Sequence, residues 1–126
     1  MPVQSMVLAL AFVLLSSAPV HAAHAQSDSG VKQIGVSAGV HFVVVASRVA
    51  RSDAELRRVA HDLCAGERVC AVRFWVNETH AARQLPMTDE EAQYEIASFT
   101  VNRNTGQDDF TCRPTTDRAP PCVPVI

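Results

Sequence analysis

The chain lacks an excess of basic charge, and it lacks a second long apolar run. Its 126 residues carry 11 Lys and Arg against 13 Asp and Glu, which gives a formal net charge of −2. Proteins that bind nucleic acid or anionic membranes carry a clear basic excess, so the composition argues against both partners. After the apolar run at residues 6–15, no stretch approaches the roughly 20 residues that a transmembrane helix needs. The length that remains predicts one small domain.

The chain also lacks the spacing of a thiol redox site, because no two cysteines form a Cys-x-x-Cys pair. A zinc site drawn from His61, Cys64, Cys70 and His80 is disfavoured. Cys64 falls on the apolar stripe of a predicted helix, whereas His61 projects to its flank. His41, His61 and His80 are typical of surface or core histidines. We therefore assign no catalytic residue and expect no metal and no cofactor.

The first 25 residues are organised like a secretory signal peptide. Residues 6–15 form an uncharged apolar run whose length suits the hydrophobic region of a signal, although residues 1–5 contain no Lys or Arg. Residues 23–25, Ala-His-Ala, match the small-x-small pattern that signal peptidase accepts. We interpret residues 1–25 as a signal peptide and predict a chain that begins at Gln26 and is periplasmic or secreted.

Four cysteines follow the predicted signal, at Cys64, Cys70, Cys112 and Cys122. An even number of cysteines in an exported chain predicts two disulfides. Four cysteines allow three connectivities. We favour Cys64–Cys70 with Cys112–Cys122, because both pairs are local in the sequence, and the other two connectivities stay open.

The hydrophobic pattern predicts a single α+β domain at residues 26–113, followed by a Pro-rich tail at residues 114–126. We expect a three- or four-stranded sheet with two helices, in the order β-β-α-β-α-β. Capping boxes open the two predicted helices, one at Ser52 and one at Thr88. The predicted strands cover residues 31–36, 40–46, 71–76 and 108–113.

The ends of the two helices follow from different signals. Gly66 occupies a position typical of a helix C-cap and closes the first helix. The second helix is predicted to end near Thr100, because Ala92, Ile96 and Phe99 follow one another at helical spacing. Residues 99–101 have a strand as their alternative.

A compound pattern joins several of these segments. It reads Cys64-x5-Cys70-x-Val72-x-Phe74-Trp75, then Leu85-Pro86-Met87-Thr88-Asp89, then Asn102-Arg103-Asn104-Thr105-Gly106, then Cys112. The pattern resembles a group of small exported bacterial proteins of unknown function, which share Cys-x5-Cys-x-Val-x-Phe-Trp, Leu-Pro-Met-Thr-Asp and Asn-Arg-Asn-x-Gly-type segments. The resemblance covers about residues 53–112. It implies an exported bacterial protein. The group has no established activity, so the resemblance assigns no catalytic residue to this chain.

Arg73 and the single tryptophan, Trp75, are the predicted binding residues. Strand alternation places them on one face of the strand at residues 71–76, opposite an apolar row that already supplies a core face. Trp and Arg are enriched at the anchors of interfaces. The competing interpretation is that the tail or the connection at residues 77–86 covers Trp75 and makes it part of the core.

These observations predict a non-catalytic binding module of the bacterial envelope. Its expected partner is an envelope protein or a cell-surface ligand. The alternative function is a small periplasmic or secreted hydrolase.

Overall fold

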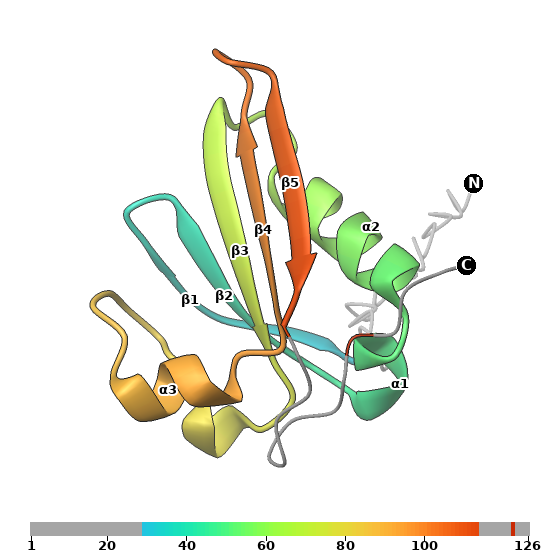
Figure 1. Cartoon of the computed structure of the whole chain (residues 1–126), viewed down its shortest axis with the longest axis vertical. Helices are drawn as coiled ribbons and strands as arrows, with labels where there is room; N and C mark the ends of the chain where they lie inside the picture. The colour runs from blue at the N-terminus through green and yellow to red at the C-terminus, as the bar shows by residue number, and fades with distance from the viewer. Residues whose placement is uncertain (1–28, 114–121, 123–126) are drawn as a thin grey trace, which may run out of the picture.

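A mixed five-stranded sheet organises the fold (Figure 1). The computed structural model describes residues 29–113 and Cys122, so the predicted signal peptide and the rest of the Pro-rich tail lie outside the described residues. In chain order the elements are β1 (Val31–Ser37), β2 (Val40–Val45), α1 (Ser47–Ala50), α2 (Asp53–Leu63), β3 (Val69–Trp75), the 3-10 helix η1 (Glu78–His80), α3 (Asp89–Tyr94), β4 (Ala97–Asn102) and β5 (Gln107–Cys112).

The strands lie in sequence order across the sheet, and only β2 and β3 are parallel. Tight hairpins join antiparallel strands, but a parallel pair needs a long crossover, which α1 and α2 provide. Figure 1 shows α2 lying along one side of the sheet, while α3 lies near the C-terminal end of β3. The α+β class is therefore confirmed, but the sheet has five strands in place of three or four. The short helix α1 is a third α-helix that the sequence pattern did not predict, so the predicted order β-β-α-β-α-β is wrong in detail.

The additional strand is β4, which the sequence pattern assigned to the end of the second helix. The helix begins as predicted, because the Thr88 hydroxyl accepts from the Glu91 amide at 3.1 Å and the Glu91 carboxylate accepts from the Thr88 amide at 2.8 Å. It ends at Tyr94, since Glu95 has an extended backbone with ψ 128°. Beyond it, Ala97, Phe99 and Val101 are buried and alternate with half-buried residues, which is the period of a strand.

The first predicted helix is confirmed as α2. The Ser52 hydroxyl accepts from the Glu55 amide at 3.2 Å, and Leu56, Val59 and Ala60 are buried against the sheet. The Glu55 carboxylate accepts from Arg58 at 3.0 Å instead of completing the expected box. This hydrogen bond is the main cause of the raised pKa of the Arg58 guanidinium.

Two hydrophobic clusters lie on opposite faces of the sheet. The first joins α1 and α2 to the sheet and includes Val43, Val45, Val72, Phe74 and Phe99. The second contains Phe42, Trp75, Ala81 and Ala82. Buried apolar side chains on both faces of β2, Phe42 on one and Val43 on the other, show that this strand is covered on both sides.

The two favoured disulfides are both present. Cys64–Cys70 ties the end of α2 to the start of β3, with 5.7 Å between the two Cα atoms. Cys112–Cys122 ties the end of β5 to Cys122, which is buried in the first cluster, with a Cα separation of 5.3 Å. Both pairs thus cross-link elements whose apolar contacts already form one core.

Candidate functional site

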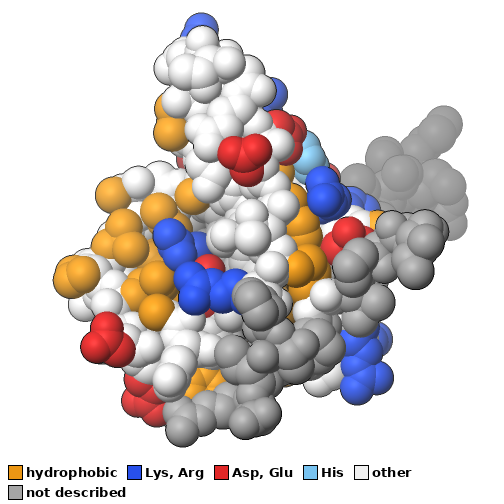
Figure 2. Space-filling view, viewed as in Figure 1, with side chains coloured by type: hydrophobic (Ala, Val, Ile, Leu, Met, Phe, Trp, Pro, Cys, Tyr) orange, Lys and Arg blue, Asp and Glu red, His pale blue; other side chains and the backbone are white. Residues whose placement is uncertain are grey.

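Among the described residues, only one half of the sheet face opposite α2 is covered by another segment. Segment 77–94 packs on the half that contains Phe42 and Trp75. The other half carries half-buried or exposed side chains that point to the same side, and we call it the open face: Val40, Ala71, Arg73, Ser98, Thr100, Asp109 and Thr111. Strand pairing sets Arg73 beside Ser98 and Ser98 beside Thr111, with Val40, Ala71 and Thr100 in the next row. In Figure 2, a group of Lys and Arg side chains lies beside a hydrophobic area near the middle of the view.

Arg73 is held in place by a buried carboxylate. Its Nη1 atom donates to Oε2 of Glu95 at 2.9 Å, and the Glu95 side chain is 0% exposed while that of Arg73 is 32% exposed. The Nε atom of Arg113 lies 3.2 Å from the other oxygen, Oε1, and Arg113 Nη1 donates to the Ala92 carbonyl at 3.0 Å. Two guanidinium groups therefore face one carboxyl group, so the cluster holds more basic than acidic side chains.

Trp75 shares the face of Arg73, as strand alternation predicts, but its side chain is 0% exposed. Its indole Nε1 atom donates to the Glu91 carbonyl at 2.7 Å, and its ring stacks on Phe42 with 6.0 Å between centroids. The expectation of an exposed Trp75 is therefore wrong. It assumed that both helices cover the same face, whereas the connection and α3 cover the face that carries Trp75. Whether Arg73 and Trp75 serve in binding stays a prediction.

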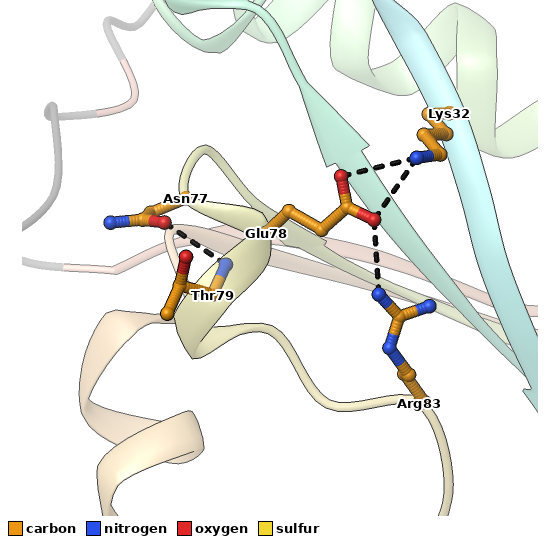
Figure 3. A network of polar contacts seen from close by, with 5 residues as sticks. All are labelled: Lys32, Asn77, Glu78, Thr79 and Arg83. Atoms are coloured by element: carbon orange, nitrogen blue, oxygen red, sulfur yellow. Dashed lines mark hydrogen bonds and ion pairs between the residues drawn. The ribbon is translucent and has the colours of Figure 1, made fainter.

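A charged network fixes the connection against the edge strand β1. Glu78 of η1 accepts from Lys32 of β1 at 3.0 Å and from Arg83 at 3.0 Å (Figure 3). The hydrogen bond from Lys32, followed by that from Arg83, lowers the pKa of the Glu78 carboxyl. The Asn77 side chain accepts from the Thr79 amide at 3.0 Å and caps η1. The connection is thus bound to β1 by side chains from both segments.

Close backbone packing reinforces this attachment at Gly35. The register of β1 against β2 shifts between Gln33 and Gly35. A Cβ atom at Gly35 would overlap the backbone carbonyl of Arg83. Only glycine allows the connection to approach the strand so closely at this position.

Each described histidine lies beside a carboxylate. His41 Nε2 is 2.8 Å from Glu67, His80 Nδ1 is 3.2 Å from Glu90, and His61 Nε2 is 3.8 Å from Asp108. Such pairs orient an imidazole, but general-base catalysis of acyl transfer also needs a nucleophile within hydrogen-bond reach. Among residues 29–113 and 122, no hydrogen bond joins a histidine ring to a serine or threonine hydroxyl.

Residues 35–39, Gly-Val-Ser-Ala-Gly, match the Gly-x-Ser-x-Gly pattern of serine hydrolases, and sequence reasoning misses this match. In those enzymes the serine stands on a turn from a strand into a helix. Here Ser37 ends β1 at a hairpin turn into β2, and its hydroxyl accepts from the Leu85 amide at 3.5 Å. Strand pairing puts Ser37 beside Val40, so the nearest histidine in the chain, His41, points to the other face.

A surface cavity of about 200 Å³ lies between β1 and α2, and none of the three described histidines lines it. Its lining residues are Ser29, Val31, Arg58, Val59, Asp62 and Leu63. The lining is mainly apolar and carries one Arg and one Asp, but no histidine or cysteine. The cavity therefore does not bring together the residues that a hydrolase mechanism would use.

Three residues whose side chains can bind a metal ion lie close together: His41, Glu67 and Cys70. One ligand atom from each residue lies within 4.8 Å of the other two. The Cys70 sulfur is bonded to Cys64 at 2.08 Å, so it is not a thiolate in this form of the protein. Sequence spacing missed this group, because His41 comes from a strand that precedes the cysteines by more than one element.

Comparison of the chain with protein-family models, with curated proteins and with solved structures finds no match. Within residues 29–113, no helix has the length and apolar character needed to cross a membrane.

Proposed function

We propose that the protein is a small exported binding module of the bacterial envelope, non-catalytic, which contacts its partner through the open face. The observation that carries this proposal is Arg73, whose guanidinium is partly exposed on that face while the buried Glu95 carboxylate holds it. Two disulfides and the apolar run at residues 6–15 support export to the periplasm or the exterior.

Arg73 suits the role of an anchor because its conformation is set before binding. An arginine that is free in solution loses side-chain entropy when a partner orders it, and this loss weakens binding. Glu95 has already fixed Arg73, and the planar guanidinium presents further N–H donors in a geometry that matches a carboxylate. Trp75 supports the position of Arg73 indirectly, because its indole donates to the Glu91 carbonyl and so holds β3 against α3. The partner that fits is an envelope protein or cell-surface ligand with an acidic group.

Site-specific photo-crosslinking in the bacterial envelope tests the open face. A photoreactive residue at Thr111 of the open face is expected to give a discrete adduct, whereas one at Ala54, exposed on α2, is not. Arg73→Lys keeps a positive charge beside Glu95 but loses the planar fork, so the adduct should weaken while the fold is retained. Equal adducts at Thr111 and Ala54, or an adduct that Arg73→Lys leaves unchanged, would contradict the proposal.

A small hydrolase is the second candidate, and the match at residues 35–39 is the observation in its favour. The hairpin position of Ser37 and its separation from His41 speak against it. An ester- and peptide-hydrolysis screen of the purified protein decides the point. Activity that disappears in Ser37→Ala would establish the hydrolase and remove the non-catalytic assignment.

A further inference from the structure

We propose that reduction of the Cys64–Cys70 disulfide replaces this cross-link with a zinc site formed by Cys64, Cys70, His41 and Glu67. This inference is independent of the proposed binding function, because it concerns the α2 side of the sheet. It rests on the position of His41 and Glu67 beside the disulfide. Neither residue is needed to form the disulfide, but both carry side chains that bind zinc.

The four residues supply the donor atoms that Zn²⁺ prefers. Thiolate sulfur, imidazole nitrogen and carboxylate oxygen bind zinc in tetrahedral geometry at about 2.0–2.3 Å. His41 Nε2 already lies 2.8 Å from the Glu67 carboxylate, and the sulfur of Cys70 is within 4.8 Å of both. Cys64 adds the fourth donor, since its sulfur is bonded to that of Cys70. Three donors, from His41, Glu67 and Cys70, therefore already lie close enough to face one ion, and reduction frees the Cys64 sulfur to turn toward them as the fourth.

The burial of these residues favours a structural site over an adventitious surface one. Cys64 and Cys70 are each 1% exposed, and the His41 side chain is 11% exposed. Glu67, at 39%, lies at the opening of the group and leaves a path for the ion. An enclosed site with four protein donors is the arrangement of structural zinc.

Two contacts outside the ligands orient them. The Nδ1 atom of His41 lies 3.4 Å from the side-chain oxygen of Gln33, so the tautomer that donates to Gln33 leaves Nε2 free to bind metal. Zinc-bound histidines in proteins are oriented by just such a hydrogen bond from their second nitrogen. The Arg103 side chain donates to the Glu67 carbonyl at 2.9 Å and so holds the loop that carries the carboxylate.

The conversion requires a dithiol reductant. The Cys64–Cys70 bond breaks, two electrons and two protons pass from the dithiol to the two sulfur atoms, and the dithiol becomes a cyclic disulfide. Zinc then displaces a proton from each thiol, the two protons pass to solvent, and two Zn–S bonds form. The metal then connects α2 to β3, as the disulfide did. It also binds β2, because His41 lies in that strand.

The experiment uses zinc and cobalt as probes of the purified protein in a Cys112→Ser/Cys122→Ser background, which removes the other two thiols. The protein is reduced with a dithiol, freed of it under nitrogen, and titrated. We expect one equivalent of zinc per chain in the reduced form and none in the oxidised form. Cobalt should give the thiolate charge-transfer and visible bands of a tetrahedral sulfur-containing site.

Variants distinguish this site from zinc bound by two thiols alone. His41→Gln and Glu67→Gln should each weaken zinc binding, and Gln33→Ala should weaken it by about 10- to 100-fold, as loss of an orienting contact does. His61→Gln, on the exposed face of α2, is the matched control and should leave the affinity unchanged. The proposal is overturned if His41→Gln binds zinc as tightly as the parent.

Circular dichroism covers the case in which reduction unfolds the chain. Zinc should then restore the native spectrum in the parent but not in His41→Gln. Failure of zinc to refold the parent also overturns the proposal.

Discussion

At the scale of the single residue, Trp75 shows how strand alternation can be read correctly and still mislead. The alternation places it opposite Phe74, and it is found there. A face on the far side of a sheet from one helix is exposed only where no other segment packs on it. The indole is covered by Ala81, Ala82 and parts of α3, which are joined to it through 6 to 19 residues of chain.

Trp75→Ala is expected to destabilise the protein by about 3–5 kcal/mol, because it leaves a cavity in a packed cluster and removes the hydrogen bond to Glu91. Val69→Ala, at an exposed position of the same strand, should cost less than about 1 kcal/mol. Urea unfolding followed by circular dichroism, with disulfides intact, measures both. A loss at Trp75 no larger than at Val69 would mean that the indole is not packed in the core.

Ala38 has an unfavourable backbone conformation for its side chain. It has φ 50° and is followed by Gly39 with φ 77°, in the two-residue turn between β1 and β2. Asparagine tolerates this left-handed region better than alanine. Ala38→Asn should therefore raise the free energy of unfolding by roughly 1 kcal/mol. The control is Ala54→Asn in α2, where the same replacement should lower stability by several tenths of a kcal/mol.

At the scale of the element, the connection between β3 and α3 behaves as part of the sheet's packing. It contacts β1 through the Glu78 network and through the Arg83 carbonyl at Gly35. A segment of this composition is easily taken for a solvent loop. Its side chains instead cover the second hydrophobic cluster, so that within residues 29–113 the open face is the part of that side with no segment packed on it.

The Glu78 network predicts a dependence of stability on pH. Its folded-state pKa is lowered from the ordinary 4.5, so its contribution is present above about pH 4.5 and is lost as the pH falls through the folded value. Glu78→Gln should therefore be less stable than the parent at neutral pH, and the difference should shrink in acid. Chemical unfolding at several pH values measures it. High salt should reduce the neutral-pH difference, because the carboxylate is solvent-accessible; a difference that grows in acid would contradict this assignment.

At the scale of the whole molecule, the two disulfides supplement a small core. Each closes a short loop, and the chain-entropy model assigns roughly 2–3 kcal/mol to a loop of about ten residues. Cys112–Cys122 has a second consequence, since it keeps Cys122 buried against the first cluster. One cross-link therefore joins α2 to β3, and the other joins Cys122 to the same core that α2 covers.

Export predicts a defined mature protein. Cleavage after Ala25 should give a chain that begins at Gln26, with or without cyclisation of that residue. Intact-mass analysis of the periplasmic or secreted protein measures this directly, and the two disulfides should make its mass lower than that of the reduced chain by four hydrogen atoms. A full-length species retained in the membrane is the result that would contradict export.

The sequence alone determined the local features. Capping boxes located the starts of α2 and α3, the pattern of apolar and β-branched residues located β1, β2, β3 and β5, and short loops favoured the two observed disulfides. These signals are contained in neighbouring residues, so they can be read without knowledge of the fold. The end of α3 was the exception, because Ile96 and Phe99 fit both a helix and a strand.

Tertiary structure alone decided which segments meet. Pairing of β4 between β3 and β5 selected the strand, because the sheet offers its backbone groups hydrogen-bond partners on both sides. Burial of Trp75, the sharing of Glu95 by Arg73 and Arg113, and the approach of His41 to Cys70 all join residues from different elements. Such contacts depend on the order and the covered face of the strands, and no local pattern specifies either.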